Sequence, residues 1–203
     1  GSFSYDNVRE GGTRNTSWET SVSHTKNEGG TKNTFISTAF NFSRRTAKGS
    51  IYGLILGGGY SDTSMTGESV GSNVGRSLAA GVYAAYPIGS SLILDLMASK
   101  TFEVNTLNTK VGEVNVVGDY DRNSTAYSLG VEGNLVLGAS SISPKFKYTV
   151  GKSVFDTGTF DIRKGSLTSK QQIDFGTDEY FRFSFSPEFR TSLGNKGSLI
   201  RPY

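Results

Sequence analysis

Few side chains in this sequence are suited to acid–base chemistry. His24 is the only histidine, and it stands at the start of the polar stretch that runs through 25–33. A hydrolase that uses a histidine base needs a carboxylate or hydroxyl partner held beside it. His24 falls at the end of the weakest apolar–polar pattern in the chain. We therefore interpret it as a solvated residue at a loop edge, and we expect no catalytic residue and no enzyme.

Two acidic stretches carry oxygen ligands of the kind that bind calcium, DYDRN at 119–123 and DTGTFD at 156–161. Neither has the full spacing of a calcium loop, so solvated turns are the better interpretation, and we expect no metal and no cofactor. LGGGYS at 56–61 is not a phosphate loop, because no GK[ST] follows it. We place these glycines within a strand, where they permit curvature or close packing.

Most other charged groups belong to segments whose polarity alternates. In SLILDLMAS at 91–99, the leucines fall on one side of a strand and Asp95 falls on the other. The same division recurs along the chain. The apolar rows contain Tyr52, Leu54, Leu56, Leu92, Leu94, Leu96, Leu129, Val131, Phe146, Tyr148, Phe181, Phe183 and Phe185. The polar rows contain Glu19, Asp95, Glu132, Lys145, Lys147, Arg182, Glu188 and Arg190.

The connections between these segments favour a membrane barrel over a soluble sandwich. They alternate between long and short, as in an up-and-down barrel with long external loops and short periplasmic turns. They fall at 25–33, 44–49, 61–76, 87–91, 101–125, 138–141, 156–178 and 192–198. The fold class expected is all-β, an antiparallel up-and-down transmembrane β-barrel with eight strands visible here.

Aromatic spacing and charge placement agree with this fold. Tyr52 and Tyr60 bracket an apolar stretch that spans about 27 Å along a strand, or roughly 20 Å of depth after a tilt of ~40°. A Lys or Arg facing lipid at mid-bilayer would cost about 2–4 kcal/mol. We therefore expect the apolar rows to face lipid and the polar rows to face a hydrated lumen. A soluble ligand-binding barrel would reverse that arrangement.

Composition is consistent with one β-rich domain. The chain has 203 residues, with 26 Gly, 13 Phe, 10 Tyr, only 4 Pro and no Cys, which excludes disulfides and thiolate metal sites. The 21 basic and 18 acidic residues are spread along the chain, so no nucleic acid partner is expected. We divide the chain into a lead-in at 1–16, without predicted structure, and a barrel domain at 17–203.

Four stretches resemble the translocator barrel of autotransporters, the type V secretion proteins of Gram-negative bacteria. They are SIYGLILGGGYSDTS, GRSLAAGVYAAYPIGSSLILDLMASKTFEVN, SISPKFKYTVGKSVFDTGTF and FRFSFSPEFRTSLGNKGSLIRPY. The resemblance implies a 12-stranded barrel in the cell outer membrane that exports and anchors an N-terminal passenger polypeptide. It also implies that the lipid bilayer and the outer-membrane insertion machinery are partners.

The strand count leaves an alternative open. Eight strands precede the terminal IRPY, which resembles the start of a further strand. We expect that the barrel lacks its last strands here. The alternative is a small barrel that closes alone and acts as an adhesin or structural pore through its long external loops.

Overall fold

The computed structural model describes residues 2–9, 12–26, 31–137, 140–193 and 198–199, with side chains placed for 12–26, 31–136 and 140–188. These residues form antiparallel strands that follow one another in chain order, with no helix among them. The strands are β1 (Ser2–Arg9), β2 (Gly12–Lys26), β3 (Lys32–Thr46), β4 (Ile51–Met65), β5 (Ser69–Ile88), β6 (Leu92–Val111), β7 (Val114–Gly133), β8 (Leu135–Leu137), β9 (Ser140–Phe155), β10 (Gly158–Lys164), β11 (Leu167–Ile173), β12 (Thr177–Leu193) and β13 (Ser198–Leu199). The expected all-β, antiparallel up-and-down architecture is confirmed. Within the described ranges, no helix is long and apolar enough to cross a membrane.

The eight strands expected from polarity correspond to the long strands β2 to β7, β9 and β12. They pair in the order β2-β3-β4-β5-β6-β7-β9-β12, with β1 and β13 at the two ends of the sheet. Of the short predicted turns, those at 44–49 and 87–91 occur, and those at 138–141 and 192–198 lie partly outside the described residues. Gly49 (φ 87°) and Gly89 (φ 65°) adopt left-handed conformations between β3 and β4 and between β5 and β6. Glycine suits both turns because a side chain is strained at such angles.

The lead-in at 1–16 differs from the prediction. β1 pairs with β2 in a register that places Ser2 opposite Glu19 and Arg9 opposite Gly12, and β2 begins at Gly12, five residues before the predicted boundary at 17. The polarity pattern missed this hairpin because a strand gains its ladder hydrogen bonds through the backbone, whatever its side chains.

The three long external loops are also largely strand. β4 and β5 continue through 61–76 to a turn at Gly67 (φ 117°), and β6 and β7 continue through 101–125 to a turn at Gly112 (φ 59°). In 156–178, β10 and β11 form a hairpin around Gly165 (φ 57°). The strand limits were taken from the alternation of polarity, but a strand does not end where the alternation fades if its partner continues beside it. DYDRN accordingly lies within β7 and is not a turn.

The β10–β11 hairpin prolongs the preceding strand. β9 pairs with β7 from Glu132 to Arg122, and β10 then pairs with β7 from Asp119 to Val114. Asp156 and Thr157 form the break between the two strands. We call residues 103–122 together with 155–175 the hairpin extension.

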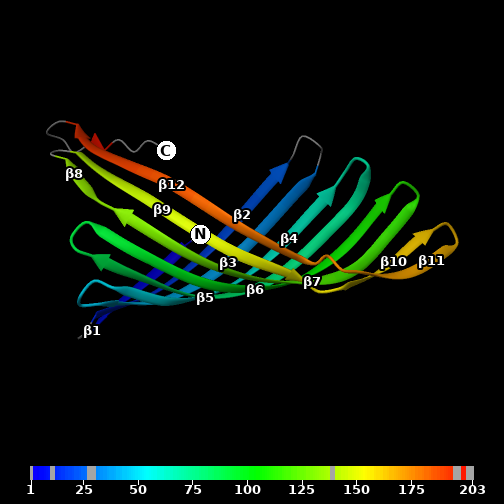
Figure 1. Ribbon diagram of the computed structural model, residues 1–203, viewed down its shortest axis with the longest axis horizontal. Helices are drawn as coiled ribbons and strands as arrows, with labels where there is room; N and C mark the ends of the chain where they lie inside the picture. The colour runs from blue at the N-terminus through cyan, green and yellow to red at the C-terminus, as the bar shows by residue number, and fades with distance from the viewer. Residues whose placement is uncertain (1, 10–11, 27–30, 138–139, 194–197, 200–203) are drawn as a thin grey trace.

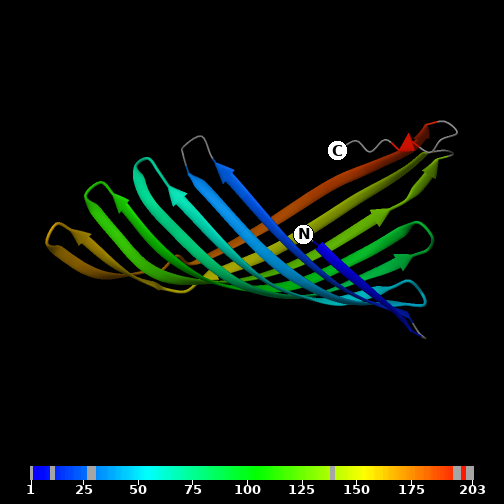
Figure 2. The ribbon, with the colours of Figure 1, turned by 180° about the vertical axis from the view of Figure 1, so that it is seen from behind.

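The sheet is curved into a trough, with the tips of the β4–β5, β6–β7 and β10–β11 hairpins at one end (Figures 1 and 2). One face is concave, and the curvature brings side chains on that face into contact across an intervening strand. Tyr83 on β5 donates a 2.8 Å hydrogen bond from its hydroxyl to Asn41 Oδ1 on β3. Gly53 on β4 leaves room for this contact, since a Cβ there would lie 2.6 Å from the Tyr83 ring.

Pro187 lies in β12, which pairs with β9 along one side. On its other side, within the described ranges, β12 pairs only through Ser192 and Leu193, with β13. Because a proline has no N–H, Pro187 cannot donate a ladder hydrogen bond to a neighbouring strand. Its register partner is Pro144, which lies where the neighbours of β9 change from β7 to β8.

Candidate functional site: the concave face

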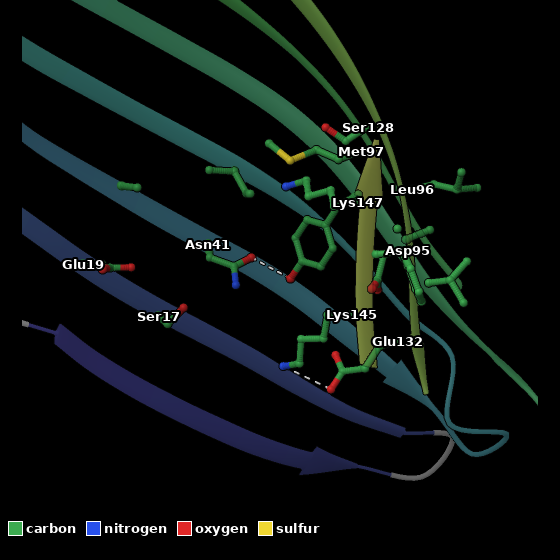
Figure 3. A pocket seen from close by; sticks show the side chains of 17 residues that line it. Ser17, Glu19, Asn41, Asp95, Leu96, Met97, Ser128, Glu132, Lys145 and Lys147 are labelled. Atoms are coloured by element: carbon green, nitrogen blue, oxygen red, sulfur yellow. Dashed lines mark hydrogen bonds and ion pairs between the residues drawn. The ribbon is translucent and has the colours of Figure 1, made fainter. Parts of the chain in front are cut away.

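The concave face is polar, and its centre is a hollow of about 550 Å³. The hollow is lined by residues from seven strands, β2 to β7 and β9, with Glu19 on one flank and Lys145 and Lys147 on the other (Figure 3). These residues are far apart in sequence. They meet because alternation places them on one face and the curvature of the sheet turns that face inward.

Charged groups gather on the β6–β7–β9 side of the hollow. Lys145 Nζ lies 3.1 Å from Glu132 Oε1, directly across the β7–β9 pair. Asp95 and Lys147 are both register partners of Gly130, which stands between them on β7. Because Gly130 has no side chain, it leaves space between the Asp95 side chain on β6 and the Lys147 side chain on β9.

Hydroxyl pairs continue the polar surface along β7 and β9. Ser128 Oγ lies 2.8 Å from Thr149 Oγ1, and Ser124 Oγ lies 2.8 Å from Ser153 Oγ. The side chains of Lys145 and Glu132 remain 47% and 37% exposed, so their ion pair is in contact with solvent and contributes little to stability. This surface can carry water and offer hydrogen bonds to a polar chain. It holds no nucleophile activated by a neighbouring base among the groups described above.

The convex face carries the apolar rows. Leu94, Val131, Phe146 and Phe185 stand in register across four strands, and Leu96, Leu129, Tyr148 and Phe183 form the next row. Phe146 and Phe185 stack with ring centroids 4.6 Å apart. We call this surface the apolar band; it also includes Tyr52, Leu54, Leu56, Leu92 and Phe181. Every one of these side chains is exposed except Leu94, which is half-buried.

The residues predicted for the lumen divide into three groups. Glu19, Asp95, Glu132, Lys145 and Lys147 line the central hollow together. Arg182 and Glu188 follow the same alternation on β12, opposite Thr149 and Ser143, but they do not line the hollow. The Arg190 side chain lies outside the described residues. His24 is exposed on β2, and its Nδ1 lies 2.9 Å from Thr34 Oγ1.

Sequence reasoning missed the side chains of the hairpin extension. An aromatic cluster forms there, with ring centroids 5.0 Å apart for Tyr120 and Phe175 and 5.8 Å apart for Phe160 and Phe175. Beside it, Arg122 forms an ion pair with Glu103. The signal was weak. In TFEVNTLNTKV at 101–111 the apolar row continues only through Phe102 and Val104, and Leu107 then falls on the other side among polar residues.

Comparison with known proteins gives only distant likenesses. No protein-family profile matches the sequence, and no curated protein matches it. Among solved structures, the ferric yersiniabactin uptake receptor from Yersinia pestis is similar over 91% of this chain and 32% of its own, at 11% identity and a TM-score of 0.47. The ferric citrate transporter in its unliganded form is similar over 96% of this chain and 35% of its own, at 8% identity and a TM-score of 0.49. This chain thus spans about a third of the length of either protein.

Proposed function

We propose that this sheet is the wall of an outer-membrane β-barrel, with the apolar band in lipid and the concave face toward an aqueous lumen. The main supporting observation is the distribution of apolar side chains, which is the reverse of that in a soluble protein. Within the described side chains, Phe160 is the only buried apolar residue that forms a core, while large apolar side chains are exposed along the whole convex face. Soluble monomers rarely expose apolar patches beyond a few hundred Å².

The total surface supports the same proposal. The chain exposes 14012 Å², whereas a compact soluble monomer of its mass would expose roughly 9,300 Å² by the usual scaling of surface with mass. A bilayer removes the apolar excess from water without requiring a core.

Strand lengths fit a wall that extends beyond the bilayer. β5, β6 and β7 each have 20 residues, about twice the ~9–11 residues that a tilted transmembrane strand needs. The excess lies at the end of the trough where the hairpin tips gather. We assign that end to the cell exterior, because outer-membrane barrels carry their longer connections there.

The proposal requires the wall to close. Unpaired backbone groups in hydrocarbon each cost several kcal/mol, so an open sheet edge is not tolerated inside a bilayer. We propose that further strands complete the barrel across the edges of β1 and β12.

For the activity, we propose a non-enzymatic translocator that exports and then anchors an N-terminal passenger polypeptide. The sequence resemblance to autotransporters supports it, as does a concave face lined with hydroxyls and hydrated charges, which can pass an extended chain. The alternative is a stand-alone barrel that acts as an adhesin or pore, and the long paired hairpins at one end favour it.

The membrane proposal is tested with a matched pair of cysteines on one strand. The chain has no native cysteine. Ser128 lies on the concave face, and its neighbour Leu129 lies in the apolar band. In outer membranes, Ser128→Cys should react with a hydrophilic maleimide and Leu129→Cys should react at least tenfold more slowly. Equal labelling of both variants contradicts the proposed orientation.

The translocator is tested by joining an epitope to the N-terminus of the complete protein. The proposal expects the epitope at the cell surface, where external protease removes it. If the barrel assembles with a normal heat-dependent gel mobility but the epitope stays in the periplasm, the stand-alone alternative is supported and translocation is rejected.

A further inference from the structure

A second hollow lies on the concave face in the outer part of the trough. It encloses about 320 Å³, near the lower limit of the ~300–1,000 Å³ typical of small-molecule pockets. Its lining includes Asn73 of β5, Asn105 of β6 and Arg122 of β7. All its lining residues come from β3 to β7 and β9, which pair with one another directly. All of the lining therefore comes from strands that are paired within this structure.

Three polar atoms of these side chains are buried without a hydrogen-bond partner among the described residues. They are Asn73 Oδ1, Asn105 Nδ2 and Arg122 Nε. Asn105 is the clearest case, because the whole residue is only 2% exposed. Buried polar groups in native proteins are nearly always hydrogen-bonded, so an unpartnered amide that lines a hollow indicates a bond supplied from outside the chain.

Asn73 and Arg122 each form a hydrogen bond through another atom of the same side chain, which holds the unpartnered atom in place. Asn73 Nδ2 donates a 3.1 Å hydrogen bond to the Tyr120 hydroxyl. Arg122 donates through Nη2 to the Glu103 carboxylate. The wall of the hollow thus holds two donors and one acceptor in fixed positions, buried directly beside the space.

The charge and the rings of the hollow indicate which ligand it fits. Arg122 and Glu103 are the only charged residues that line it, and they neutralise each other, so no free cation is left for a phosphate or carboxylate. Phe35, Tyr120 and Phe155 contribute aromatic rings. A sugar combines hydroxyls, which both donate and accept, with an apolar C–H face that packs on a ring. We propose that this hollow binds a neutral saccharide.

Gly75 keeps the hollow open. A Cβ at this position would lie 2.5 Å from Ser61 Oγ, 2.9 Å from Asn105 Oδ1 and 3.1 Å from Glu103 Oε1. An alanine would therefore displace the Ser61 hydroxyl and the Asn105 amide, and would crowd the carboxylate that neutralises Arg122. The binding site goes beyond the proposed translocator function and requires neither a passenger nor its export.

The test uses the complete protein purified in detergent from outer membranes. Maltose, lactose and diacetylchitobiose are titrated by calorimetry and by saturation-transfer NMR, with citrate and inorganic phosphate as charged probes. We expect saturable binding of at least one sugar. Asn105→Leu should weaken it at least tenfold, whereas Asn108→Leu, an exposed position on the same strand, should leave it unchanged.

Gly75→Ala provides a second variant that removes no hydrogen-bonding group, and Gly58→Ala is its control, since a Cβ there meets nothing closer than 3.3 Å. Gly75→Ala should also weaken binding at least tenfold, and Gly58→Ala should not. The proposal is overturned if no sugar binds saturably, if only citrate or phosphate binds, or if Asn105→Leu and Gly75→Ala bind as tightly as their controls. None of these results bears on epitope export, so the two proposals fail separately.

Discussion

The apolar band and the hairpin extension share parts of β6, β7 and β9, but their aromatic side chains are arranged in opposite ways. In the band, rings such as Phe183 point outward from the convex face and are 63% exposed. In the extension, Phe160 points into the concave side and is 0% exposed, with Phe175 packed edge-on against it. The band exposes its aromatic rings, as expected of a surface that faces lipid. The extension buries an aromatic ring, as expected of a protein in water. The difference is one between the convex face and the concave side of the extension, where a small aromatic cluster forms.

The largest effect on stability is expected from Phe160→Ala, which tests whether the hairpin extension is held together by its buried aromatic ring. Removing a buried phenylalanine typically costs about 3–5 kcal/mol. Because β10 pairs only with β7 and β11, the loss should be confined to the hairpin extension. Amide hydrogen exchange should accelerate in β10 and β11 and remain unchanged in β4. Uniform acceleration throughout the sheet would show that the two regions are not separate.

A charged residue placed in the apolar band tests whether the convex face contacts lipid. Leu129→Lys should lower the free energy of unfolding in phospholipid vesicles by about 2–4 kcal/mol, the penalty for a lysine facing mid-bilayer lipid. Ser128→Lys, on the concave side of the same strand, is the control and should change it by less than about 1 kcal/mol. Urea titrations followed by tryptophan fluorescence measure both variants, and equal losses would argue against lipid on the convex face.

A smaller effect is expected where the concave face is tightly packed. At Gly53, a Cβ would lie 2.6 Å from the Tyr83 ring and 2.7 Å from the Phe42 carbonyl oxygen. Gly53→Ala should destabilise the sheet by about 1–3 kcal/mol through overpacking. Gly58→Ala on the same strand should have little effect. The same urea titration distinguishes them, and an unchanged Gly53→Ala would mean that the trough is less tightly curved.

The smallest effect is expected from the ion pair in the central hollow. Glu132 and Lys145 are both partly exposed, so their coupling energy should be at most about 1 kcal/mol and should fall as salt is added. A double-mutant cycle with Glu132→Gln and Lys145→Met measures it. A salt-independent coupling well above that value would mean that the concave face is dry, and would weaken the contrast between wet lumen and lipid-facing band.

Local polarity predicted the band well. The alternation of Leu94, Asp95 and Leu96 identified β6, and the same pattern found all eight long strands and predicted which residues share a side of each. This information is local because side chains alternate along a strand regardless of what lies beyond it. The same criterion failed where polar residues occupy both faces, as in β1 and in the outer parts of β6 and β7, since backbone pairing sets strand ends there.

From its sequence alone, this chain is determined to be a β-rich wall with one apolar and one polar face, because strand periodicity and residue type suffice for that. Only the tertiary structure decided how the sheet curves, and that Asn73, Asn105 and Arg122 share one hollow. Those facts depend on register and curvature, which join residues dozens of positions apart. No local pattern encodes such distances.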